Sequence, residues 1–129
     1  GLSLGNNGII SGTLSHKARS EKITVRITDS VNESITQTFT ITVLKALRIA
    51  GKLRTGRTGQ AYSDSLKPKG GLGPFSWTIT SGAVPGLSFN NATGAFTGIP
   101  TQVGEFPLTV QVTDALGGVD VESLTLRIR

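Results

Sequence analysis

The chain has 129 residues and a formal net charge of +5, and it contains 17 glycines but neither cysteine nor methionine. This length allows one domain with a sizeable core but not two large domains, and the lack of cysteine excludes disulfides, thiolate nucleophiles and cysteine-based metal sites. No apolar run approaches the roughly 18 residues of a membrane-spanning helix, so we expect no membrane insertion within this segment, and the 36% hydrophobic content favours a thin β-sandwich over a helix-rich enzyme.

In the first third of the chain, apolar and polar residues alternate in two segments, 23–27 and 39–43. The apolar positions are Ile23, Val25 and Ile27, followed by Phe39, Ile41 and Val43. A period of two predicts antiparallel strands with one buried face and one face in water. No apolar helical pattern persists over three turns anywhere in the chain, so we expect no long helix.

Basic residues concentrate in the next segment. Residues 45–69 contain seven lysines and arginines against the single acid Asp64. Such a segment can attract anionic polymers or lipid headgroups. We instead favour the interpretation that its Lys and Arg residues protect sheet edges from pairing with other chains.

The remainder repeats the strand pattern with frequent turn formers. Alternation is clearest in residues 75–79, 106–112 and 124–128. Glycine, proline and asparagine punctuate these segments, at Gly70-Gly71, Gly73-Pro74, Ser81-Gly82, Pro85-Gly86, Asn90-Asn91, Thr93-Gly94 and Gly117-Gly118. Short strands with such spacing predict a two-sheet sandwich. Trp77 is in phase with Phe75 and Ile79, so we expect its ring at the centre of the core.

The chain contains an internal repeat of about 85 residues. Gly1-Leu2-Ser3 aligns with Gly86-Leu87-Ser88, and the Thr-Asp pair at residues 28–29 aligns with the pair at 113–114. We interpret residues 45–129 as a complete unit and residues 1–44 as the C-terminal half of the preceding unit. The first residue is therefore expected to lie inside a repeat rather than at a natural start.

The spaced glycines, prolines and aromatic residues of this unit resemble a known family. The pattern consists of Gly59-Gln60-Ala61-Tyr62, Pro74-Phe75-Ser76-Trp77, Pro85-Gly86-Leu87-Ser88-Phe89, Thr93-Gly94-Ala95-Phe96-Thr97-Gly98-Ile99-Pro100, Gly104-Glu105-Phe106 and Val110-Gln111-Val112-Thr113-Asp114. It is similar to the He-PIG immunoglobulin-like repeats of bacterial surface proteins, which are related to dystroglycan-type cadherin-like domains. The resemblance implies an all-β, immunoglobulin/cadherin-like Greek-key sandwich in tandem arrays, without enzymatic activity. Residues 1–44 depart from the pattern at Leu14, which stands where Pro100 stands in the complete unit, and at residues 16–21, which lack counterparts of Gly104 and Phe106.

Few side chains suggest a catalytic or metal site. Asp29 and Asp114 each follow a strand and are carboxylates that Ca²⁺ prefers, but that ion needs six or more oxygen ligands and the acids do not converge. We interpret both as caps of the following hairpin, with weak calcium binding left open. His16, the only histidine, lies in a polar loop without partner ligands. We therefore predict no catalytic, cofactor-binding or metal-binding residue.

Aromatic residues offer the main alternative to a purely structural role. Trp77, Phe75 and Tyr62 could stack on a sugar, although the phase of Trp77 and Phe75 points them at the core. Two N-glycosylation sequons, at Asn32-Glu33-Ser34 and Asn91-Ala92-Thr93, are interpreted as turn residues. No nucleotide or nucleic-acid motif is present in the sequence.

Taken together, the residues and the resemblance predict a non-catalytic structural or adhesion module of a secreted or cell-surface protein, bacterial and built of tandem repeats. The expected partners are neighbouring immunoglobulin-like repeats and a surface protein or glycan, and the expected location is extracellular. The alternative is a carbohydrate-binding accessory module of a secreted hydrolase. A glycan screen separates the two functions.

Residues 1–44 present an apolar face without the strands that would cover it. Burying one such side chain contributes roughly 1.5–3 kcal/mol, so six exposed ones would forfeit much of a domain's stability. We therefore expect self-association through residues 1–44, either face to face in a two-fold dimer or by strand exchange.

Overall fold

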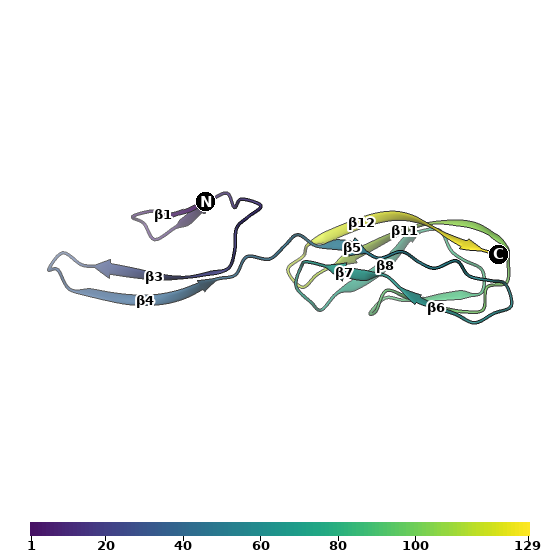
Figure 1. Ribbon diagram of the computed structural model, residues 1–129. Helices are drawn as coiled ribbons and strands as arrows, with labels where there is room; N and C mark the ends of the chain where they lie inside the picture. The colour runs from purple at the N-terminus through teal and green to yellow at the C-terminus, as the bar shows by residue number, and fades with distance from the viewer. The chain divides into compact units, whose positions relative to one another are not determined.

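The computed structural model describes residues 1–129 and consists of twelve strands joined by turns and loops, without a helix. The predicted all-β fold class is therefore confirmed. The chain contains two compact units, Gly1–Leu44 (unit 1) and Lys45–Arg129 (unit 2). Figure 1 shows the strands of each unit. No helix of the length and apolarity needed to cross a membrane occurs.

Unit 2 contains eight strands. They are β5 (Arg48–Ala50), β6 (Tyr62–Ser65), β7 (Lys67–Lys69), β8 (Ser76–Ser81), β9 (Leu87–Asn90), β10 (Ala95–Gly98), β11 (Gly104–Thr113) and β12 (Val119–Ile128). Two antiparallel sheets of three strands form, in the orders β12-β11-β8 and β6-β10-β9, and β5 pairs with β7. In each three-stranded sheet a strand from the front part of the unit (residues 45–85) joins two strands from its back part (residues 86–129).

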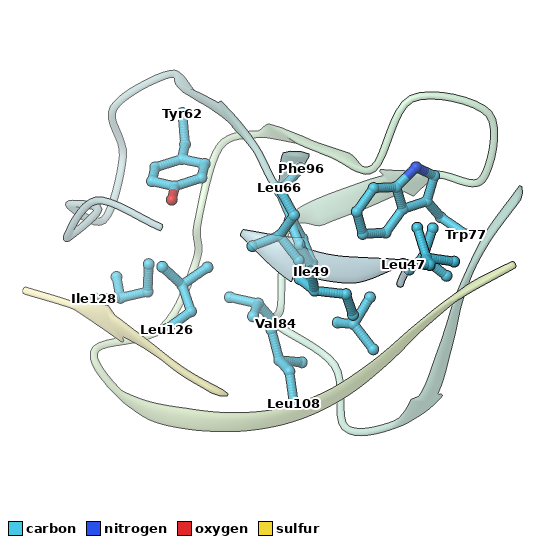
Figure 2. Packing of buried hydrophobic residues seen from close by; sticks show 12 residues of the cluster. Leu47, Ile49, Tyr62, Leu66, Trp77, Val84, Phe96, Leu108, Leu126 and Ile128 are labelled. Atoms are coloured by element: carbon cyan, nitrogen blue, oxygen red, sulfur yellow. The ribbon is translucent and has the colours of Figure 1, made fainter. Parts of the chain in front are cut away.

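The core of unit 2 lies between these sheets. One sheet contributes Trp77, Leu108, Val110, Val112, Leu126 and Ile128, and the other contributes Tyr62 and Phe96. Figure 2 shows Trp77 beside Leu47 at one end of this cluster and Tyr62 above Leu126 and Ile128 at the other. Trp77 is 1% exposed, which confirms that its ring belongs to the core, but the ring lies at one end of the cluster (Figure 2) rather than at the centre that the sequence predicted.

Alternation along β11 explains the sandwich. Leu108, Val110 and Val112 are buried, whereas Pro107, which precedes Leu108, is exposed. Val110 and Val112 lie opposite Ile79 and Trp77 of β8, with a register shift between Thr109 and Val110. Because successive side chains point to opposite faces of a strand, every second residue of β11 enters the core.

The strand β7 explains part of the basic segment. Its residues Lys67, Pro68 and Lys69 pair with β5 alone, so its second edge has no strand partner. Lysine resists the approach of another strand through its charge, and proline lacks the N–H that strand pairing requires. This geometry supports the edge-protecting interpretation of the basic residues.

Unit 1 contains two hairpins. β1 (Leu2–Leu4) pairs with β2 (Ile10–Gly12), and β3 (Glu21–Thr28) pairs with β4 (Ser34–Ile41). The second predicted strand begins earlier and ends earlier than the alternation in 39–43 suggested. Val43 lies outside the strand, and its N–H donates to the Ser20 hydroxyl at 2.8 Å.

Candidate functional site

The most unusual surface of the chain is an uncovered sheet face in unit 1. Alternate residues of β3 and β4 place six apolar side chains on the same face, which we call the open face: Ile23, Val25, Ile27, Ile35, Phe39 and Ile41. Together with the β1–β2 hairpin, the open face lines a groove of about 840 Å³. No residue of unit 1 is fully buried.

The opposite face of this hairpin is polar. Thr24 lies opposite Thr38, and their hydroxyl oxygens are 3.0 Å apart. In unit 2, Thr109 lies opposite Ser123 in the same way, and their hydroxyl oxygens are 3.4 Å apart. The β3–β4 hairpin is therefore amphipathic like a pair of strands in a β-sandwich. One face is apolar, as in a strand pair that packs on a core, and the other is polar.

Each strand of unit 1 has a counterpart in unit 2, about 85 residues later. In the first hairpin the offset is 86 at two positions, where Gly8 and Gly12 align with Gly94 and Gly98. β1 and β2 correspond to β9 and β10, and β3 and β4 correspond to β11 and β12. In unit 2 the front part adds β6 to β10 and β8 to β11. Unit 1 contains no strand in either position.

The two aspartates that follow β3 and β11 form the same turn. Asp29 Oδ1 accepts hydrogen bonds from the N–H groups of Val31 at 2.9 Å and Glu33 at 3.0 Å. Asp114 Oδ1 accepts the corresponding bonds from Leu116 at 3.0 Å and Gly118 at 2.7 Å. The prediction that both residues cap a hairpin is confirmed.

Asp114 makes one further contact that Asp29 does not make. Its Oδ2 accepts a hydrogen bond from the N–H of Leu72, in the front part of the unit, at 3.2 Å. Loss of hydration acts in the opposite direction, but the N–H donors of Gly118, Leu72 and Leu116 hold the pKa of Asp114 below its ordinary value of 3.8. Sequence analysis missed this link because no local pattern connects Leu72 with Asp114.

The other ionisable candidates do not assemble into a site. His16 is exposed in the loop between β2 and β3. No group of three or more histidine, cysteine, aspartate or glutamate side chains is placed to hold a metal ion. Both sequons fall in turns, where Asn32 adopts a φ of 64° and Asn91 follows Asn90, whose side chain caps the β9–β10 turn through Ala92.

Arg54, Tyr62 and Asp64 form a polar cluster that sequence analysis did not identify. The Tyr62 hydroxyl donates to the Arg54 carbonyl at 2.9 Å, and the Arg54 guanidinium lies 3.3 Å from Asp64. Burial, reinforced by the charge of Asp64, raises the pKa of Tyr62 to about 12. Although burial acts against it, N–H donors from Arg54 and Ser65 and the guanidinium hold the pKa of Asp64 below its ordinary value. The cluster anchors the Tyr62 ring at the edge of the core.

The aromatic residues do not form a sugar platform in unit 2. Trp77 and Tyr62 are buried, and Phe75 packs against the core. Among all seven aromatic residues only Phe39, on the open face, is exposed, with 49% of its surface accessible. An aromatic ring on which a sugar could stack is therefore available in unit 1, at Phe39, and not at Trp77, the alternative that the sequence left open.

A model of the family described as "Putative Ig domain" (He_PIG) matches residues 1–44 and 52–129. Among solved structures, a Bacteroides fragilis protein described as a "putative alpha-galactosidase/melibiase" is 18% identical, with a TM-score of 0.58 over 64% of this chain and 17% of its own. A second B. fragilis protein, described as a "putative alpha-galactosidase", is 24% identical, with a TM-score of 0.55 and the same coverage of 64% and 17%. A search of curated proteins gives no match.

These likenesses differ in what they establish. The chain spans only 17% of the length of either alpha-galactosidase, so the two structures show a shared fold and nothing of this chain's activity. The family match covers nearly all of both units and confirms the resemblance seen in the spaced glycines, prolines and aromatic residues. The chain belongs to the He-PIG family of immunoglobulin-like domains.

Proposed function

We propose that the chain is a non-catalytic structural and adhesive module of a tandem-repeat protein outside the cell. The observation that carries this proposal is the recurrence of four strands and their Asp-capped hairpin after 85 residues. Consecutive copies of one domain with a short connection are typical of stalks and arrays in which each repeat contacts its neighbours. Neighbouring repeats are thus the first class of partner.

The extracellular location agrees with the chemistry of the chain. It has no cysteine or methionine and so avoids oxidisable sulfur. The exposed edge strand β7 carries lysines and proline, which limits pairing with other chains at high local concentration. A surface protein is the second class of partner that we propose for such a module, and glycan binding belongs to the second candidate function below.

A specific observation favours a second candidate function, a carbohydrate-binding accessory module of a secreted hydrolase. Two proteins described as putative alpha-galactosidases contain this fold in 17% of their length. Sugar-binding modules use exposed aromatic rings, and Phe39 is the one exposed ring of the chain. Because Trp77 and Tyr62 are buried, we rank this function second.

A glycan-array screen of the full chain, followed by titration of any positive glycan, separates the two functions. We expect no saturable binding with a Kd below about 1 mM, because the chain offers no pair of exposed aromatic rings on which a sugar could stack. Saturable binding that Phe39→Ala abolishes, and that Thr36→Ala on the opposite face leaves intact, would favour the carbohydrate-binding function. Hydrolysis of a chromogenic α-galactoside by the purified chain would overturn the non-catalytic assignment.

A further inference from the structure

We propose that the open face is one side of an unfilled interface that accepts the front half of an immunoglobulin-like repeat, with the chemistry of residues 45–85 of this chain. This inference rests on the tandem-repeat part of the proposed function but not on its adhesive or extracellular part. Four observations on separate residues support it.

The strand edges supply the first observation. In unit 2, β11 lies between β12 and β8, and β10 lies between β9 and β6. In unit 1 the corresponding β3 pairs only with β4, and β2 pairs only with β1. Both edges that are vacant in unit 1 are those that the front part occupies in unit 2, and an exposed edge is a template for an added strand.

The apolar side chains supply the second observation. Val112 of β11 lies opposite Trp77 and is 0% exposed, whereas its counterpart Ile27 is 65% exposed. Val110 is likewise fully buried, and its counterpart Val25 is the same residue type but remains in part accessible. Unit 1 therefore has the apolar residues of a core face, but no strand in the position where β8 lies beside β11 in unit 2.

The glycines of the first hairpin supply the third observation. Gly94 has a φ of +68°, and a Cβ placed there would lie 2.9 Å from the Trp77 indole. Its counterpart Gly8 has a φ of +81°, and no atom lies within 4 Å of the same position. Gly8 lines the groove, so the groove is open where the indole lies in unit 2. By analogy with Trp77, we infer that this part of the groove accepts a large aromatic ring carried on an added strand.

The capping aspartate supplies the fourth observation. Asp114 Oδ2 accepts the N–H of Leu72 at 3.2 Å and so ties the front part to the hairpin. Asp29 uses Oδ1 for the same two turn hydrogen bonds, but its Oδ2 accepts no hydrogen bond. A loop equivalent to residues 70–73 would supply the donor that this oxygen lacks.

A second copy of the chain fits the open face less well than a front half. Each chain has one front part and two back parts, so exchange between copies always leaves one back part per chain uncovered. Two open faces packed against each other would cover the apolar residues but leave the β2 and β3 edges without strand partners. The face-to-face dimer expected from the sequence stays a prediction and becomes the alternative outcome of the test.

The test joins a copy of residues 45–85 to the N-terminus of the full chain, so that the copied Pro85 precedes Gly1 as Pro85 precedes Gly86. The full chain contains one tryptophan, so the grafted chain contains two. We expect two well-dispersed indole N–H signals in the ¹⁵N–¹H spectrum. We also expect hydrogen exchange of the β3 amides to slow by at least about 100-fold, and a monomer by light scattering.

Two variants of the grafted chain serve as controls. Ile27→Lys places a charge on the open face and should restore fast exchange in β3. Thr36→Lys introduces the same charge on the opposite face of β4 and should leave the protection in place. The resident Trp77 signal reports in each sample that unit 2 is folded.

The proposal is overturned if the second indole resonates at the random-coil position and β3 exchanges as fast as in the parent chain. If the grafted chain is still a dimer by light scattering and its β3 amides still exchange fast, the proposal is overturned and face-to-face packing of two open faces is favoured. If the grafted chain precipitates, a peptide of residues 72–83 is titrated into the full chain. Shifts confined to β2, β3 and the open face support the proposal, and their absence at millimolar peptide overturns it.

Discussion

Residues 1–44 and residues 86–129 have nearly the same local structure but differ in burial. Both contain a short hairpin with a glycine at positive φ, followed by a longer hairpin capped by an aspartate. In unit 2 the longer hairpin contributes fully buried residues, and in unit 1 it contributes none. The two segments therefore share their local geometry, whereas only the longer hairpin of unit 2 pairs with a further strand, β8, and is buried.

The contrast has an energetic consequence. An isolated two-stranded hairpin is at best marginally stable in water, and each sheet of unit 1 has two strands. Unit 2 has two three-stranded sheets and a core to which all twelve buried hydrophobic residues belong. None of these core residues comes from residues 1–44, so unit 2 should fold by itself.

The largest effect that we predict is a difference in hydrogen exchange between the paired hairpins. Amides of β11 and β12 should exchange at least about 10³-fold more slowly than those of β3 and β4, because opening the former requires unfolding of the core. Exchange of the full chain followed by mass spectrometry or NMR measures both hairpins in one sample. Equal protection would mean that something already covers the open face.

Substitution of Trp77 should have the next largest effect. Trp77→Ala removes a fully buried ring and should lower the free energy of unfolding of unit 2 by about 3–5 kcal/mol. Urea unfolding followed by circular dichroism measures the loss. Phe39→Ala, which removes an exposed ring in unit 1, is the matched control and should leave unit 2 unchanged. An unaltered transition in Trp77→Ala would place the ring outside the core.

Much of this fold was predictable from the sequence. The alternation in 75–79 and 106–112 identifies the strands and the buried side of each, because strand periodicity depends only on the pleat. The Thr-Asp pairs at 28–29 and 113–114 predict the capped turns, since an aspartate side chain accepts the N–H two residues later. These features are local and need no knowledge of the tertiary structure.

The contacts that sequence analysis missed have no signal in the sequence pattern. Tyr62 could not be placed because its hydroxyl donates to the Arg54 carbonyl across a loop. The bond from Leu72 to Asp114 joins residues 42 positions apart, and no spacing indicates it. The open groove was also not predictable in detail, because it depends on how the β1–β2 hairpin lies against β3 and β4 within unit 1.

A pair of glycines in unit 2 tests the contact between hairpin and tryptophan. Gly94 and Gly117 both have positive φ, but only Gly94 lies against the Trp77 ring. Alanine at either position costs about 1–2 kcal/mol of backbone strain. Gly94→Ala should cost more than Gly117→Ala in thermal unfolding, because its methyl group also displaces the indole. Equal losses would show that the ring moves away freely.

The N–H donors around Asp114, from Gly118, Leu72 and Leu116, predict a pH dependence. The pKa of Asp114 is lower in the folded state than its ordinary value of 3.8, so its contribution is present above about pH 4 and is lost as the pH falls through the folded-state value. Asp114→Asn keeps one acceptor but replaces Oδ2 with an NH₂ group, so it should lower the melting temperature at pH 7. As the pH falls through the folded-state pKa, the melting temperatures of the variant and the parent should move closer together. A gap between them that stays constant throughout an acid titration would assign the effect to packing rather than charge.

The smallest effect concerns calcium, to which Asp29 and Asp114 could respond differently. Asp114 has both oxygens engaged by N–H donors, whereas Asp29 has Oδ2 free, so Asp29 is the more available ligand. Ca²⁺ requires about six to eight oxygens, and neither aspartate belongs to a group of three or more His, Cys, Asp or Glu side chains that could hold a metal ion. Melting curves of the full chain in EDTA and in millimolar CaCl₂ should therefore superimpose. A shift of several degrees that Asp29→Asn removes and Asp114→Asn retains would show that the aspartate of unit 1 binds the ion and that the two hairpins differ in function as well as in burial.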